Sequence, residues 1–196
     1  MFACRHQPLV LPGELAARLA TAYSEPHRAY HTLAHIAEVL GWFDRVADDA
    51  GWQRPAEVYV AIVFHDAIYV PGAKDNEARS AAWARASGLA VDVDRVAALI
   101  ELTARHGGLA PADVDAEAAL FLDCDMAILG AEPAAFDAYD AQIAVEYQHV
   151  PRDAYRAGRR AFLAAVAAKP RIFLSDYFHA LLDAPARANL ARVMAA

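Results

Sequence analysis

Residues 32–43 read Thr32-Leu-Ala-His-Ile-Ala-Glu-Val-Leu-Gly-Trp-Phe43. The apolar residues in this segment recur at three- and four-residue spacing, at Leu33, Ile36, Val39, Leu40 and Phe43. That spacing places them on one face of an α-helix, where they form a stripe that packs against a core. The same spacing continues through most of the chain, alanine is abundant, and the alternation typical of strands is nearly absent. The sequence therefore predicts an all-α fold.

Turn signals between the apolar runs predict where the helices begin and end. Proline suits the first turn of a helix, aspartate and asparagine cap its start, and glycine or a following proline marks its end. On these signals we expect helices over 13–23, from Thr32, from Pro55 to a break at Pro71-Gly72, from Asp75 or Asn76 to Gly88, from Asp92 or Asp94 to Gly107-Gly108, over 112–129, over 133–147, between Pro151 and Pro170, and in the tail. No internal repeat or linker interrupts the 196 residues, so one domain is expected.

The composition argues against several classes of partner. The formal net charge is -7 and the 18 lysines and arginines are scattered, so no basic patch for nucleic acid is evident and a small-molecule partner is expected. Pro12, Glu14 and Arg18 interrupt the N-terminal apolar run before it reaches the length of a signal peptide or membrane span. We therefore expect a cytoplasmic protein with no membrane partner. The two cysteines, Cys4 and Cys124, are too few for a disulfide framework or a zinc ribbon.

The sequence contains none of the common catalytic strings, so any chemistry must come from dispersed polar residues. The dipeptide His65-Asp66 lies inside the apolar run 58–70, in which the only other polar residues are tyrosines. A buried carboxylate without compensation is strongly unfavourable or becomes neutral. Asp66 therefore needs a cation or strong hydrogen-bond donors. A divalent metal would supply the cation, and hydrogen bonds to neighbouring helices are the alternative.

Two further pairs of polar residues lie in apolar surroundings. His31 and His35 are four residues apart and would share a face of a continuous helix, unless His31 belongs to the preceding turn. One could bind a metal while the other reaches the substrate, or both could be core histidines bonded to carbonyls. Asp123 and Asp125 are two residues apart, so a helix would point them roughly 200° apart. Only one of them should reach a given metal, and the other would support it or face solvent.

Two imidazoles and two carboxylates form a mixed nitrogen and oxygen set. Such a set suits Mn²⁺, Fe²⁺, Co²⁺, Ni²⁺ or Zn²⁺, and Mg²⁺ is less natural because of the histidines. The sequence does not choose among these metals.

Taken together, these strings resemble the HD superfamily, in which a histidine, a His-Asp dipeptide and a distant aspartate on helices bind a metal. Much of the chain is similar to one bacterial branch, the predicted HD-superfamily metal-dependent phosphohydrolases. The similar strings are Tyr30-His-Thr-Leu-Ala-His35-Ile, Phe64-His-Asp-Ala-Ile-Tyr69, Asp75-Asn-Glu-x-x-Ser80-Ala, Phe121-Leu-Asp-Cys-Asp-Met-Ala-Ile-Leu-Gly130, Glu146-Tyr147 and Ala186-Arg-x-Asn-Leu190. The resemblance implies one all-α, HD-type helical bundle over 1–196, with a metal-binding core over about 27–130 and C-terminal helices over about 131–196.

The resemblance also implies a role for individual residues. The metal ligands would be His35, His65, Asp66 and Asp125, with Asp123 in support. His31 would protonate the leaving group.

Further expectations concern four more residues. Glu77 would orient the attacking water, unless it is only an acidic residue near a helix start. Lys74, Arg79 and His106 would contact the substrate, although solvated surface is the alternative for the first two and a structural role for the third. The branch often has an arginine where this chain has Ala144, so no phosphate contact is expected from that position.

We expect a metal-dependent phosphohydrolase that cleaves a phosphate ester or anhydride of a nucleotide or another small phosphorylated metabolite. One alternative is a non-catalytic nucleotide-binding or regulatory module, because fold and metal do not determine activity. Another is a di-iron oxygenase, which needs more histidines in register than this chain provides, and a purely structural helical protein is the last. The alanine-rich C-terminal helices could pack internally or form a homodimer, and composition does not separate these arrangements.

Overall fold

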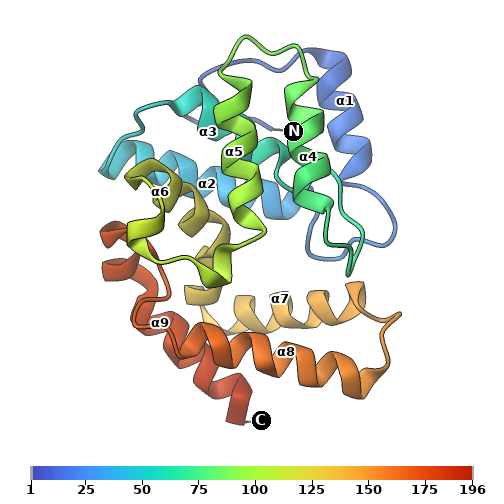
Figure 1. Cartoon of the computed structure of the whole chain (residues 1–196), viewed down its shortest axis with the longest axis vertical. Coiled ribbons are helices and arrows are strands. Elements are labelled where there is room, and N and C mark those ends of the chain that lie inside the picture. Colours follow the sequence, from blue (N-terminus) through green and yellow to red (C-terminus); the bar gives the residue numbers. More distant parts are fainter. Residues whose placement is uncertain (1, 196) are drawn as a thin grey trace. The chain divides into compact units, whose positions relative to one another are not determined.

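The structure is a computed structural model, which describes residues 2–195 (Figure 1). These residues form α-helices and short 3₁₀ helices and contain no β-strand. The predicted all-α fold is therefore confirmed. The chain splits between His106 and Gly107 into two compact units, called unit 1 and unit 2 below. The predicted division into a core over 27–130 and C-terminal helices over 131–196 stays a prediction.

Unit 1 is built around a helix that is buried on all sides. Its α-helices are α1 (Gly13–Ala22), α2 (Leu33–Asp49), α3 (Pro55–Phe64), α4 (Asn76–Arg85) and α5 (Val93–Thr103). α3 contacts α2, α4 and α5, and every residue from Val58 to Phe64 is 0% exposed. A helix that is apolar around its whole circumference must be enclosed in this way. His65 and Asp66, which directly follow α3, are therefore positioned by the centre of the unit.

Several helix starts in unit 1 follow the predicted signals. The Thr32 side chain accepts a hydrogen bond from the Ala34 amide at 3.3 Å, and Pro55 occupies the first turn of α3. The Asp92 carboxylate accepts from the Arg95 amide at 3.1 Å at the start of α5. The first turn of a helix leaves its backbone amides unpaired. A threonine or aspartate side chain accepts a hydrogen bond from one of these amides, and proline has no amide hydrogen to leave unpaired.

Three predicted helix boundaries, two ends and one start, were wrong. α3 ends at Phe64 instead of continuing to Pro71-Gly72, because side chains of other segments bond the backbone of the residues that follow, as described below for the candidate site. α5 ends at Thr103, and residues 106–108 form a separate 3₁₀ turn, η1. α6 (Ala116–Met126) begins later than residue 112, because the Asp115 carboxylate caps it by accepting from the Ala118 amide at 2.8 Å.

Unit 2 contains α6, α7 (Pro133–Glu146), α8 (Arg152–Ala167) and α9 (Asp176–Ala195), with short turns η2 (Pro111–Asp113) and η3 (Ala127–Gly130). α9 contacts α6, α8 and η3. The largest fully buried side chains of unit 2 are the aromatic residues Phe121, Phe136, Phe173 and Phe178. The tail therefore forms one long helix that closes the core of this unit.

The string Ala186-Arg-x-Asn-Leu190 has a structural role in unit 2. The Asn189 amide donates to the carbonyls of Leu129 and Ala131 at 3.0 and 2.8 Å, which joins α9 to η3. Arg187 donates to carbonyl oxygens at the end of α8 and in the segment after it, at 2.8 to 3.0 Å. Both residues satisfy carbonyl groups that end a helix and would otherwise lack donors. This string thus fastens α9 to the rest of unit 2.

Replacing Gly130 by Ala is expected to lower the free energy of unfolding by about 1 to 3 kcal/mol. An added Cβ would lie 2.7 Å from the Leu182 Cβ and 3.0 Å from the Leu182 carbonyl oxygen, so η3 and α9 would have to separate. Gly158 in α8 is the matched control, because a Cβ there meets nothing within 4 Å. Gly158→Ala should raise the free energy of unfolding by about 0.5 to 1 kcal/mol. Urea denaturation measures both, and equal shifts would contradict the close approach at Gly130.

Candidate metal centre

Three side-chain atoms of unit 1 converge as the ligands of one metal ion would. The His65 Nε2 lies 3.0 Å from Asp66 Oδ2 and 3.2 Å from His35 Nε2, and the His35 Nε2 lies 3.6 Å from Asp66 Oδ2. Metal–ligand bonds of about 2.1 Å place neighbouring ligand atoms about 3.0 to 3.4 Å apart in octahedral and tetrahedral geometry. His35, His65 and Asp66 could therefore hold a metal ion.

His35 reaches the centre from the first turn of α2. Thr32 caps this helix and α2 begins at Leu33, so His31 belongs to the preceding turn and not to the helix. The two histidines still lie close together, with ring centroids 5.9 Å apart. The sequence had left open whether they share a helix. The cap at Thr32 decides this, because the helix begins after it and therefore contains His35 but not His31.

His65 is fixed by a hydrogen bond to the backbone of its own helix. Its Nδ1 lies 2.8 Å from the Ile62 carbonyl oxygen, which can only accept, so Nδ1 carries the proton. The Nε2 of the neutral ring is then an acceptor that points to the centre. A backbone carbonyl often orients a metal-binding histidine in this way.

Arg28 connects the two segments that carry the candidate ligands. Its guanidinium donates to the carbonyls of His31, Asp66 and Ala67 at 3.0, 2.8 and 3.2 Å. The same group pairs with Glu25 at 3.1 Å, and its side chain is 0% exposed. Three bonds to carbonyls from two segments hold the backbone at His31 and Asp66 in register. Arg28 was not among the residues predicted from the sequence, because no spacing rule connects it to a residue 38 positions away.

Asn76 and Ser80 hold the segment after Asp66 from the other side. The Asn76 side chain accepts from the Val70 amide and donates to the Val70 carbonyl, both at 3.0 Å. One turn later in α4, the Ser80 hydroxyl accepts from the Ile68 amide at 3.0 Å. The string Asp75-Asn-Glu-x-x-Ser80-Ala thus supplies the backbone partners that an extended helix would have supplied. A signal for this was present in the sequence, since these two polar residues are spaced to share a helix face.

The charge state of Asp66 is set by opposing effects. Burial raises its pKa, but positive charge on the nearby imidazoles of His65, His31 and His35 and a hydrogen bond from His65 lower it, and the pKa ends well below its usual range. The carboxylate therefore stays ionised because positive charge lies beside it, and a metal ion would supply that charge where the imidazoles are neutral. The side chains of His35 and His65 are 1% and 2% exposed and that of Asp66 is 17% exposed. The centre is thus closed on the histidine side and open beside the carboxylate.

The other predicted residues of unit 1 differ in their placement. His31 stacks on Tyr69 with ring centroids 4.1 Å apart, next to the centre. Glu77 is half-buried in the first turn of α4, and Lys74 and Arg79 are exposed. His106 is half-buried in η1. Among the residues from 2 to 195, the group within metal-ligand reach includes none of His31, Glu77 and His106. The predicted roles of all five residues stay predictions.

The aspartate pair lies on α6 in unit 2, where the two carboxylates have different surroundings. Asp123 is buried, and its carboxylate accepts from the Leu174 amide at 2.8 Å and from the Ser175 amide and hydroxyl at 2.7 and 2.6 Å. Burial raises the pKa of Asp123 to about 6, although these donors oppose the shift. The carboxylate therefore holds the segment before α9. Asp125 is half-buried, and it stays a predicted ligand as Asp123 stays a predicted supporting residue.

Comparisons with known proteins give no match: no family model, no curated protein and no solved structure matches this chain. None of the helices described between residues 2 and 195 combines the length and apolar character needed to cross a membrane.

Proposed function

We propose that this protein is a metal-dependent phosphohydrolase of the cytoplasm, which cleaves a phosphate ester or anhydride of a nucleotide or another small phosphorylated metabolite. His35, His65 and Asp66 would hold a divalent metal. The proposal combines the geometry of the three converging atoms with the resemblance of the surrounding strings to HD-superfamily phosphohydrolases.

One observation carries the metal assignment: two acceptors face each other at 3.0 Å. The Nδ1 proton of His65 is committed to the Ile62 carbonyl, so its neutral ring presents a lone pair at Nε2. That lone pair faces the Oδ2 of the Asp66 carboxylate. Two such atoms repel unless a cation lies between them. A divalent metal removes the repulsion and also uses the His35 Nε2 at 3.2 Å, whereas a second proton on His65 would require a buried imidazolium.

The donor set favours a transition metal. Two imidazole nitrogens with carboxylate oxygens suit Mn²⁺, Fe²⁺, Co²⁺, Ni²⁺ or Zn²⁺ better than Mg²⁺, which prefers oxygen ligands and retains its waters. When bound, such an ion supplies a Lewis acid for the phosphoryl group and lowers the pKa of a water molecule. The exposed edge of Asp66 is the side from which substrate and water would enter.

His31 is the residue best placed to donate a proton to the leaving oxygen. It precedes α2, it is half-buried, and its ring stacks on Tyr69 beside the candidate ligands. Arg28 holds the His31 carbonyl at 3.0 Å, so the backbone that presents the ring is fixed to the backbone of Asp66. A histidine in this position can protonate an alkoxide or phosphate leaving group as the P–O bond breaks.

A panel of phosphorylated compounds tests the proposal directly. Purified protein is treated with a chelator, reloaded with Mn²⁺, Co²⁺, Ni²⁺ or Mg²⁺, and assayed for phosphate release from nucleotides and sugar phosphates. We expect release that requires added metal and is lost again with chelator. Tight nucleotide binding without product at any metal would instead favour the non-catalytic module. Two irons per chain with oxygen-dependent turnover would favour the oxygenase.

The leaving group distinguishes a proton donor from a residue that only binds. His31→Gln is expected to slow hydrolysis of a poor alkyl leaving group by about 10² to 10⁴. With 4-nitrophenyl phosphate the loss should be much smaller, because nitrophenolate leaves without protonation. His6→Gln is the matched control, since His6 is exposed and pairs with Asp48 on the surface. An equal loss for both leaving groups would contradict the proton-donor role.

A further inference from the structure

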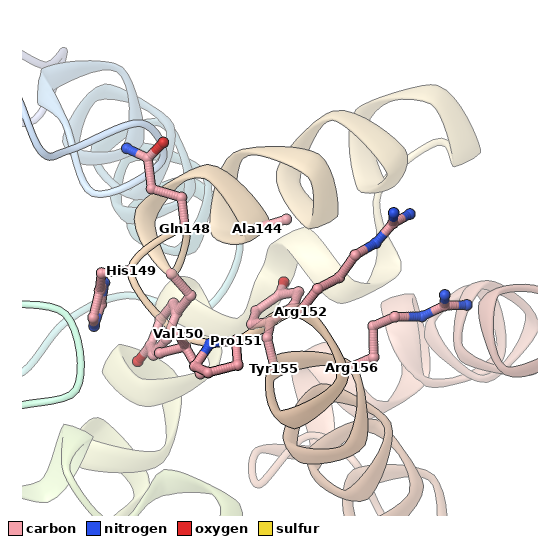
Figure 2. Close-up of a pocket in the computed structure, with 9 residues that line it drawn as sticks. Ala144, Gln148, His149, Val150, Pro151, Arg152, Tyr155 and Arg156 are labelled. Atoms are coloured by element: carbon pink, nitrogen blue, oxygen red, sulfur yellow. The ribbon is translucent and has the colours of Figure 1, made fainter.

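Unit 2 contains a pocket between the end of α7 and the start of α8 (Figure 2). Its volume is about 650 Å³, which lies within the range of small-molecule sites. Every lining residue belongs to unit 2: Ala144, Tyr147, Gln148, His149, Val150, Pro151, Arg152, Tyr155 and Arg156. The pocket contains none of the residues assigned above to the metal centre.

The pocket has a positive lining without acidic residues. Arg152 and Arg156 are one turn apart on α8, and Figure 2 shows both side chains extending to the same side of the helix. Both are exposed, and neither forms an ion pair with any carboxylate of residues 2–195. Arg159 on the same helix differs, because its guanidinium bonds Asp140 at 2.8 Å. Two unpaired guanidiniums at one pocket are suited to a doubly charged anion.

A buried hydroxyl at the pocket has no hydrogen-bond partner. The Tyr155 hydroxyl is enclosed by protein atoms and bonds none of them. Figure 2 shows Tyr155 extending from α8 toward Ala144 on α7. Buried hydroxyls are nearly always bonded, so the side chains around this part of the pocket leave one polar group unsatisfied. The small side chain of Ala144 leaves space beside it.

Aromatic rings form another part of the lining. The rings of Tyr147 and Tyr155 lie with centroids 5.9 Å apart, and His149 stacks on Tyr147 at 6.0 Å. Such rings offer a flat apolar surface to a planar ligand. The pocket thus combines a site for a charged group with a surface for a ring.

We propose that this pocket binds a small molecule that carries a phosphate monoester and a planar ring, as a nucleoside monophosphate does. Arg152 and Arg156 bind the phosphate. The ring lies against the tyrosines. A carboxylate would carry one charge where two guanidiniums are available, so phosphate is the better fit. This inference does not depend on the proposed hydrolase activity, because no residue is shared with the metal centre.

Calorimetry with the full chain in the presence of a chelator tests the proposal without turnover. The probes are adenosine 5′-monophosphate, adenosine and inorganic phosphate. We expect saturable binding of the monophosphate, and binding at least about tenfold weaker for each of the other two, since each lacks one half of the ligand. No saturable binding of the monophosphate, or equal binding of adenosine, would overturn the proposal.

Variants locate the binding in this pocket. Arg152→Gln and Arg156→Gln should each weaken binding about tenfold, because each removes a charge-assisted hydrogen bond. Ala144→Leu adds no charge at an exposed helix position, and it should weaken binding by a similar factor because it fills the space beside Tyr155.

Arg160→Gln is the charge-matched control on α8, since Arg160 is exposed and does not line the pocket. Equal weakening by Arg160→Gln, or an unchanged affinity in Ala144→Leu, would overturn the assignment. Asp66→Asn should bind as the wild type does, which separates this inference from the proposed hydrolase.

Discussion

The Asp66→Asn variant is expected to bind its metal more than about a hundredfold more weakly than the wild type and to lose metal-dependent phosphate release. An amide is neutral and a poor ligand for a divalent metal. Its NH₂ group can, however, donate to the His65 Nε2, which lies 3.0 Å from the Asp66 carboxylate in the wild type. The substitution therefore replaces a repulsive pair of acceptors with a hydrogen bond. Metal-free Asp66→Asn should be as stable as the metal-free wild type, or more stable.

Metal analysis by mass spectrometry and urea denaturation measure these two effects separately. Asp94→Asn provides the matched control, because the Asp94 side chain is 87% exposed and lies in the first turn of α5. This control should retain both metal and activity. A wild type that binds no divalent metal after reconstitution would show that the assignment of the centre is wrong. A large loss of stability in metal-free Asp66→Asn, with no effect on metal, would favour a structural role for the cluster.

Replacing Arg28 by Met is expected to lower the free energy of unfolding by about 3 to 5 kcal/mol. Methionine fills similar volume but cannot donate, so the carbonyls of His31, Asp66 and Ala67 lose their partner inside the protein. The guanidinium also lies over the Tyr23 and Tyr69 rings, at 5.2 and 5.4 Å from their centroids. Because Arg28 holds the backbone on both sides of the centre, metal affinity should fall about 10- to 100-fold as well.

Arg45→Met is the control for this substitution. Arg45 is 51% exposed on α2, where it pairs with Asp49 at 3.7 Å and lies over Trp42. Surface contacts of this kind contribute little, so the free energy of unfolding should change by less than about 1 kcal/mol. Denaturation with urea and metal titration of both variants give the comparison. Similar values for the two variants would mean that the carbonyl bonds of Arg28 are not needed to hold the site.

The histidine pair and the aspartate pair differ in whether nearby residues determine their roles. The sequence correctly predicted that α2 begins near Thr32, because the capping threonine lies directly before the helix that it starts. That boundary alone places His31 outside the helix. The surroundings of Asp123 could not be predicted in this way, since the donors to its carboxylate come from residues 51 and 52 positions away. No pattern within α6 encodes those donors.

The end of α3 was mispredicted for the same reason. The residues after Phe64 remain apolar, and nothing local stops a helix before Pro71. The chain leaves the helix because Arg28, Asn76 and Ser80 bond its backbone from 6 to 39 residues away. This exit turns Asp66 toward His35 and His65, so the error in the predicted helix end and the geometry of the candidate centre have one cause.

The sequence by itself determined that the protein is all-α and that the His31 and His35 pair, the His65-Asp66 dipeptide and the Asp123 and Asp125 pair are the polar residues to examine. These conclusions depend on neighbours within a few positions: a 3.6-residue period, caps next to helix starts, and a carboxylate inside an apolar run. Only the tertiary structure decided that the three ligand atoms converge within 3.6 Å and that a buried arginine holds the two segments together. Hydrogen bonds and ligand distances between remote segments depend on how whole helices pack. Packing of that kind leaves no fixed spacing in the sequence.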